Sequence, residues 1–181
     1  MQLFEKISKE NIVEYLLLMF QLEDVVRALH FDKNKVFQLF SGNNEKMEEK
    51  EAMAFYTKLI EDMQSEGIIR KGHLSALQDI ILELVYLHNT LITIFNNDAY
   101  KKIVADSSLD IAEFRKKSNL KEKHDVEVML HAMYMQLQLN MRKQKIGEET
   151  LNALNTMRKQ LAFLAEEYKK MKSGDLNFIQ N

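Results

Sequence analysis

The order of apolar and polar positions along the chain predicts a protein built of helices. Residues 9–29 and 74–95 are apolar around most of a helical circumference, and Ser8 is the expected N-cap of the first segment. Residues 125–145 form a third long segment of the same character. Helices that are apolar on most sides belong in the middle of a bundle, so we expect three long, central helices.

Further segments carry an apolar line on one side only and are predicted as amphipathic helices. They cover residues 33–40, 45–65 and 147–172. In the last of them, apolar residues recur at alternating spacings of three and four, as in a short heptad seam: Leu154, Met157, Leu161, Leu164, Tyr168 and Met171. A seam of this length usually packs within a bundle, although it also offers a surface for a second copy of the chain.

Residues 96–120 are predicted to form two short helices with a break at residues 106–108. Ser107 precedes Asp110 by three positions, which is the spacing of a capping box at a helix start. We therefore place the start of a new helix at this point.

The distribution of proline and glycine along the chain also favours helices over strands. There is no proline, and the five glycines fall where helical patterns end or have not yet begun: Gly42, Gly67, Gly72, Gly147 and Gly174. No window alternates apolar and polar residues for long enough to compete as a strand. The sequence thus predicts an all-α, single-domain helical bundle of seven or eight helices over residues 1–174, with residues 175–181 as a loose tail.

Composition excludes several classes of function. The chain has no cysteine, which removes disulfide frameworks, thiolate metal sites and cysteine nucleophiles. Its 25 basic and 27 acidic residues give a net charge of −2, so no overall field would hold it on nucleic acid or an anionic membrane. The start lacks the pattern of a secretory signal and no apolar run reaches membrane-spanning length, so we expect a cytoplasmic protein.

The stretch SEGIIRKGHL, residues 65–74, allows two interpretations. Arg70, Lys71 and His73 precede a predicted helix, whose free N–H groups could bind a phosphate or carboxylate together with them. Alternatively the stretch only connects two helices, with Gly67 ending the first and Ile68 folding back over its last turn. We favour the connector and keep the anion site as the second hypothesis.

His88 is the candidate for a buried polar group. It shares a helical face with Leu84 and Ile92, while Glu14 and Asp24 lie on one face of the first long helix. His88 with Glu14 or Asp24 could transfer protons, but a core histidine satisfied by a neighbour is the commoner arrangement. No motif supplies a nucleophile or a phosphate-binding loop, and we predict no catalytic residue and no cofactor.

The residues around the histidines and the basic clusters argue against a metal site and against a nucleic-acid site. No Glu-x-x-His pair occurs, and His124, Glu127 and His131 lie on one polar face that fits a solvated surface, so we predict no metal site. The densest basic cluster, residues 115–123, falls near a predicted helix C-terminus, where cations offset the helix dipole. Only Phe114 offers a ring for base stacking, which argues against nucleic acid as a partner.

Three segments resemble one family of bacterial all-helical proteins of this length whose domain has no assigned function. They are NIVEYLLLMFQLEDVVRAL at residues 11–29, SEGIIRKGHL at residues 65–74 and LAFLAEEYKK at residues 161–170. The resemblance spans nearly the whole chain and is weakest over residues 96–123. It implies an α-helical cytoplasmic bacterial protein and brings no activity, cofactor or catalytic residue with it.

Two function hypotheses follow from these observations. The leading one is a non-enzymatic helical interaction module that associates with a second copy of itself or with a protein partner, because apolar helices occur without an assembled catalytic set. The alternative is a small-molecule-binding protein or enzyme with a pocket between the central helices, using His88 with Glu14 or Asp24. A roomy cavity in the structure would favour the second hypothesis.

Overall fold

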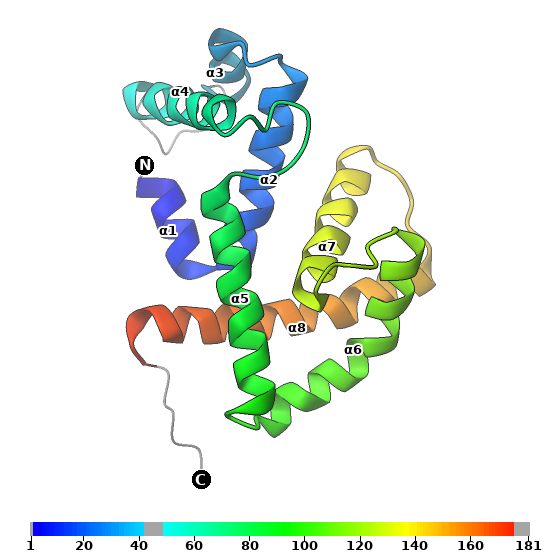
Figure 1. Ribbon diagram of the computed structural model, residues 1–181. Helices are drawn as coiled ribbons and strands as arrows, with labels where there is room; N and C mark the ends of the chain where they lie inside the picture. Colours follow the sequence, from blue (N-terminus) through cyan, green and yellow to red (C-terminus); the bar gives the residue numbers. More distant parts are fainter. Residues whose placement is uncertain (1, 42–48, 176–181) are drawn as a thin grey trace. The chain divides into compact units, whose positions relative to one another are not determined.

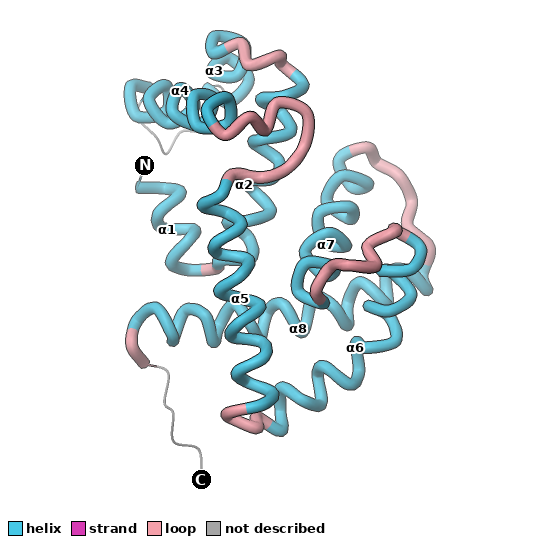
Figure 2. Tube along the Cα trace, viewed as in Figure 1, coloured by secondary structure: helices cyan, strands magenta, loops and turns pink. Residues whose placement is uncertain are grey.

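The computed structural model describes residues 2–41 and 49–175 and confirms the all-α fold. Within these residues the chain forms eight helices and no strand (Figure 1). Within each of the two described ranges, short turns and loops join consecutive helices (Figure 2). The chain divides into two compact units, Met1–Asp79 and Ile80–Asn181.

The first unit contains α1 (Gln2–Glu10), α2 (Ile12–Ala28), α3 (Lys33–Ser41), α4 (Glu49–Ser65) and the first turn of α5 (Ser75–Thr93). Helix α1 packs on α2, α3 packs on α4, and α2 contacts α4. The buried side chains of this unit come mainly from α2 and α4: Ile12, Leu16, Met19, Leu22, Val26, Tyr56, Leu59, Ile60 and Met63. Burial of these aliphatic and aromatic groups supplies the driving force that holds the unit together.

Helix α2 begins later than predicted, because the chain forms an additional helix in front of it. Asn11 is the N-cap, and its side chain accepts hydrogen bonds from the backbone N–H groups of Val13 and Glu14 at 3.1 and 3.2 Å. The expectation that Ser8 caps this helix was wrong, since Ser8 lies inside α1. Asparagine is as good an N-cap as serine, and the buried ring of Phe4 anchors the short α1.

The second unit contains the rest of α5 with α6 (Asp98–Lys117), α7 (Asp125–Met141) and α8 (Glu148–Ser173). Helices α6 and α7 both pack on α8 and contact each other. The segments predicted as long helices are present as α2, α5 and α7, with 17, 19 and 17 residues. Helices α6 and α8 are longer still, with 20 and 26 residues.

The break predicted at residues 106–108 does not exist, because α6 runs through it without interruption. Ser107 is fully buried, and its hydroxyl lies 2.5 Å from the side-chain oxygen of Gln160 on α8. Asp110 accepts a hydrogen bond of 2.6 Å from the hydroxyl of Thr156, also on α8. Both side chains of the expected capping box are therefore used between helices, which the spacing in the sequence does not reveal.

The heptad seam of α8 is buried within its own unit. Five of its six side chains are buried: Leu154, Met157, Leu161, Leu164 and Tyr168. This confirms the interpretation that a seam of this length packs within a bundle. The seam is therefore no longer evidence for association with a second copy of the chain.

Several expectations lie outside the described residues or stay predictions. Gly42 and the first residues of the helix predicted over 45–65 lie outside the described residues, as do residues 176–181 of the expected tail. Helix α8 ends at Gly174, whose φ of +80° is the left-handed conformation that glycine tolerates best. A single folding domain over residues 1–174 remains a prediction beside the two compact units.

Candidate functional site

An apolar pocket lies in the first unit, where α1, α2, α4 and the start of α5 supply its walls. Its volume is about 620 Å³, inside the roughly 300–1,000 Å³ range of small-molecule sites in proteins. The apolar lining consists of Phe4, Tyr15, Met19, Ala54, Phe55, Leu59, Leu74, Ala76 and Leu77. The pocket therefore offers a ligand a mostly hydrophobic surface.

Stacked aromatic rings form one wall of the pocket. The rings of Phe4 on α1 and Phe55 on α4 lie with centroids 4.0 Å apart and planes inclined by 9°. Phe55 also meets Tyr56 edge to face, with centroids 5.3 Å apart. Such pairs stabilise a fixed ring arrangement beyond the area that they bury, so this wall is preformed.

Tyr15 on α2 lines the pocket and is its one aromatic residue with a hydroxyl group. It is half-buried, and no hydrogen-bond partner of its hydroxyl is found among the described residues. Burial raises the pKa of Tyr15 above its usual value of 10.0, because the phenolate would lose solvation. The hydroxyl therefore stays protonated at physiological pH and remains a hydrogen-bond donor.

The charged residues of the lining balance one another. They are Glu5 and Lys9 on α1, and Lys58 and Asp62 on α4. The Lys58 ammonium lies 2.9 and 3.1 Å from the two carboxylate oxygens of Asp62. Two carboxylates and two ammonium groups cancel formally, so the lining has no net charge.

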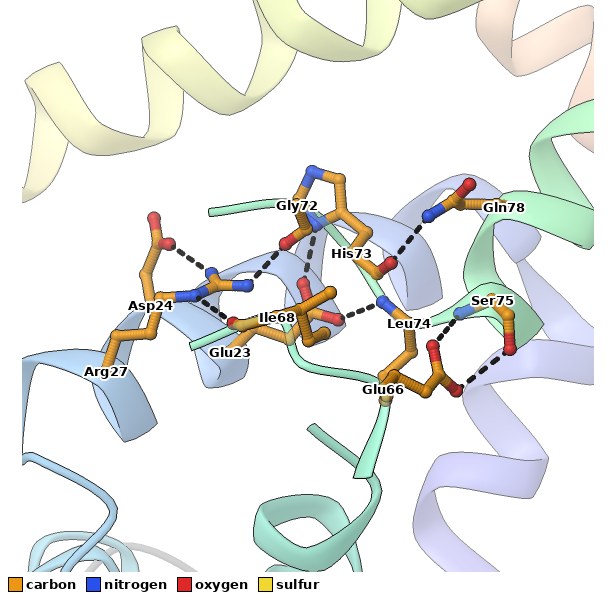
Figure 3. Close-up of polar contacts among 10 residues, drawn as sticks. All are labelled: Glu23, Asp24, Arg27, Glu66, Ile68, Gly72, His73, Leu74, Ser75 and Gln78. Carbon is orange, nitrogen blue, oxygen red and sulfur yellow. Dashed lines mark hydrogen bonds and ion pairs between the residues drawn. The ribbon is translucent and has the colours of Figure 1, made fainter. Parts of the chain in front are cut away.

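The connector between α4 and α5 has the geometry of a helix end. Gly67 has a φ of +70°, and the N–H groups of Gly67 and Ile68 bond to the carbonyls of Gln64 and Met63 at 3.1 Å. This is the Schellman arrangement, with Ile68 folded back over the last turn. The guanidinium of Arg27 then reaches from α2 to the carbonyls of Ile68 and Gly72 (Figure 3).

A buried carboxylate completes the attachment of the connector to α2. Glu23 has no exposed surface, and its oxygens accept a 2.9 Å hydrogen bond from the backbone N–H of Leu74 and lie 2.5 Å from Nδ1 of His73 (Figure 3). The His73 ring stacks on Phe20 with centroids 3.8 Å apart. Because the side chain of Leu74 lines the pocket, Glu23 also positions part of the pocket wall.

A second carboxylate accepts a hydrogen bond from the next backbone N–H group at the start of α5. Glu66 accepts hydrogen bonds from the backbone N–H of Ser75 at 2.7 Å and from its hydroxyl at 2.8 Å. The anion hypothesis assigned this helix start to a phosphate or carboxylate held with Arg70, Lys71 and His73. In the structure the chain's own carboxylates satisfy these amides, and His73 faces Glu23.

The prediction that His88 is buried is confirmed, since only 4% of its surface is exposed. Its Nδ1 lies 2.7 Å from the hydroxyl of Tyr100 on α6 and 3.5 Å from the amide nitrogen of Gln160 on α8. Gln160 in turn meets Ser107. Burial, reinforced by the nearby His124, lowers the pKa of His88 to about 4, so the ring is neutral at physiological pH.

The acids proposed as partners of His88 are placed in the first unit. Glu14 has an exposed side chain in the first turn of α2. Asp24 forms an ion pair with Arg27, whose Nη1 lies 2.9 Å from its carboxylate. The pairing of His88 with either acid remains a prediction, and the hydrogen-bond partners of the His88 ring are Tyr100 and Gln160.

The other polar clusters singled out in the sequence form local pairs. His124 and Glu127 make a capping box at the start of α7. In the basic cluster, Arg115 pairs with Asp125, and Lys123 lies 2.7 Å from Glu127. No group of three metal-ligating side chains is found within residues 2–41 and 49–175. These pairs favour local structural roles for the clusters.

The sequence suggested a pocket between the central helices only as the alternative hypothesis, and it did not indicate the residues that line this one. Met19, Leu59 and Leu77 lie on helical faces that the pattern assigns to a closed core, and nothing in their spacing distinguishes a filled core from a hollow one. The wall from α1 was missed because that helix was not predicted. The spacing of Leu3, Phe4 and Ile7 before Asn11 is the signal that could have indicated it.

Comparison with known proteins identifies a family and no individual relative. A family described as Domain of unknown function (DUF4924) matches residues 1–175, in agreement with the resemblance seen in the sequence. The curated proteins and the solved structures give no match. Of the helices in the described ranges, none has both the length and the apolar character required to cross a membrane.

Proposed function

Since the chain belongs to the DUF4924 family, whose description names no function, we propose from its geometry that it is a non-enzymatic binding protein that takes up an apolar small molecule. The pocket of the first unit carries this proposal. It joins an apolar lining to a few polar groups, which is the composition of small-molecule sites. This proposal differs from the alternative hypothesis of the sequence analysis, because Tyr15 lines the pocket and His88 does not.

The buried polar groups elsewhere support binding without catalysis. His88, Tyr100, Gln160 and Ser107 contact one another in the core of the second unit. A catalytic base must reach a proton of the substrate, whereas these groups use one another as partners. The pocket is lined instead by groups suited to holding a molecule in place.

The proposal is tested by filling the pocket with a larger side chain. Ala76 lines the pocket and is exposed, so Ala76→Phe adds a ring there without disturbing buried packing. The uncharged fluorophore 1-aminoanthracene serves as the probe, and its affinity is measured by fluorescence titration. We expect Ala76→Phe to weaken binding at least about tenfold, which corresponds to about 1.4 kcal/mol.

The matched control is Ala105→Phe, which makes the same change at an exposed position of α6 in the second unit. We expect this variant to bind the probe like the unaltered protein. Thermal unfolding of both variants checks that they remain folded. Absence of probe binding to the unaltered protein, or equal binding by both variants, would rule out the pocket as the binding site.

A second candidate function is self-association, and a different observation favours it. Leu82 and Tyr86 lie four residues apart on α5 and are 64% and 70% exposed. Residues at this spacing share a helical face, and exposed apolar side chains gain by meeting the same face of a second copy. We therefore propose this face as a homodimer contact, and an unidentified protein partner is the other candidate occupant.

We propose the bacterial cytoplasm as the location, because the family resemblance implies it and a composition without cysteine needs no oxidising compartment.

A further inference from the structure

Building on the proposed function, we infer that the ligand of the pocket is an uncharged, largely apolar molecule with one hydrogen-bond acceptor, such as a ketone or quinone carbonyl, and that the Tyr15 hydroxyl binds this acceptor. The inference combines the charge balance of the lining with the one aromatic hydroxyl in it. It deepens the proposed function by naming a ligand class.

The charges of the lining argue against an ionised ligand. Glu5 and Lys9 oppose each other in sign on α1, and Lys58 is already paired with Asp62 on α4. A carboxylate or ammonium ligand would lose solvation against the apolar wall and find no excess of opposite charge to compensate it. A neutral ligand avoids this cost.

The hydroxyl of Tyr15 supplies the polar recognition. It lacks a hydrogen-bond partner among the described residues, and burial disfavours its ionisation. A carbonyl oxygen of the ligand can accept a hydrogen bond from this donor. Ser8 is the other neutral polar side chain of the lining, and it lies on α1 next to the charged Lys9.

The pocket has room for a bicyclic molecule of this class. Its walls include the stacked Phe4 and Phe55, against which a flat aromatic ligand packs well. Leu74 and Leu77 contribute aliphatic surface at the start of α5. A flat ring system with a carbonyl at its edge therefore matches both the apolar walls and the hydroxyl.

A pair of matched probes tests the inference on the full chain. 2-Acetylnaphthalene and 2-ethylnaphthalene have similar shapes, but only the first has a carbonyl acceptor. Their dissociation constants are measured by displacement of 1-aminoanthracene from the unaltered protein, from Tyr15→Phe and from Ser8→Ala. We expect Tyr15→Phe to weaken binding of the ketone about fivefold and to leave the hydrocarbon unchanged, while Ser8→Ala changes neither.

The outcomes separate the two proposals. If 1-aminoanthracene and both naphthalenes fail to bind, the proposed function itself fails. If both naphthalenes bind and Tyr15→Phe leaves their affinity ratio unchanged, the assigned role of Tyr15 is overturned and the pocket stands.

A charged probe tests the neutrality of the ligand. 2-Naphthoate presents a carboxylate on the same ring system, and at neutral pH we expect it to bind at least about tenfold more weakly than the ketone. Binding as tight as that of the ketone would overturn the inference that the ligand is uncharged.

Discussion

At the scale of single residues, His88 shows what burial does to a titratable group. Its neighbours Leu84 and Ile92 in the sequence were enough to predict that the ring is buried. Its partners Tyr100 and Gln160 lie 12 and 72 positions away and come from other helices. Local periodicity determines which side of a helix faces the core, but it does not say which polar groups meet there.

The lowered pKa of His88 predicts a dependence of stability on pH. The folded state binds this proton with a pKa of about 4, whereas the unfolded chain binds it near 6.5. Between these values the unfolded chain holds more protons, so the free energy of unfolding falls as the pH drops from about 6.5 to about 4. The full contribution is about 3 kcal/mol, from 1.36 kcal/mol for each pKa unit.

Urea unfolding of His88→Gln at pH 7 and pH 4.5 measures this contribution. We expect the variant to lose less stability than the unaltered protein between these two pH values, because it has no imidazole to protonate. His30→Asn is the control, since His30 is exposed and its φ of +53° suits asparagine. An identical pH dependence of stability in His88→Gln and in the unaltered protein would contradict the lowered pKa of His88.

At the scale of elements, the start of α5 depends on side chains from outside the helix. Glu23 on α2 accepts from the N–H of Leu74, and Glu66 after α4 accepts from the N–H of Ser75. Both carboxylates lie at the positive end of the helix dipole. The carboxylates at this helix start belong to the chain itself, whereas the hypothesis of a bound phosphate or carboxylate held by Arg70, Lys71 and His73 stays a prediction.

Truncation of Glu23 is expected to destabilise the first unit. Glu23→Ala removes the hydrogen-bond partner of the buried Leu74 amide and of the partly buried His73 ring. We therefore expect the free energy of unfolding to drop by roughly 2–4 kcal/mol. Glu14→Ala removes an exposed glutamate from the same helix and should cost only a few tenths of a kcal/mol. Urea unfolding compares the two, and similar losses would show that the Glu23 contacts do not stabilise the fold.

The elements most accurately predicted are those with a strong pattern and clear ends. Helix α8, with its seam and its glycines at both ends, begins and ends within about one residue of the prediction. Helix α6 was split wrongly because Ser107 and Asp110 do not cap a helix start: Asp110 bonds to α8, and the Ser107 hydroxyl meets α8 and carbonyls of its own preceding turn. Helix α1 has nine residues, and its signal is limited to the spacing of Leu3, Phe4 and Ile7, which is weaker than the pattern of the longer helices.

At the scale of the whole molecule, the helical class was predictable and the candidate site was not. The absence of proline, the placement of glycine and the helical period of the apolar positions all favour helices, whatever their packing. The pocket instead depends on side chains from four helices, among them Phe4, Tyr15, Phe55 and Leu77. Whether facing helices fill the space between them depends on long-range packing, which a single sequence does not display.

The oligomeric state is the whole-molecule property that tests self-association. We expect the unaltered protein to sediment as a dimer at high concentration and Tyr86→Glu to sediment as a monomer, because a charge on the exposed α5 face opposes its apolar contact. Leu109→Glu is the control, since it places the same charge on an exposed apolar position of α6. A monomer at every concentration of the unaltered protein would end the dimer proposal.

The attachment of the connector to α2 has a practical consequence. Arg70 and Lys71 are exposed and are the residues after which trypsin cuts, in a stretch flanked by Gly67 and Gly72. A protease needs this segment to detach and enter its cleft, and the contacts of Arg27 and Glu23 oppose that detachment. The rate at which trypsin cuts these two bonds therefore reports how often the segment detaches from α2. This rate can be measured on the protein without any label.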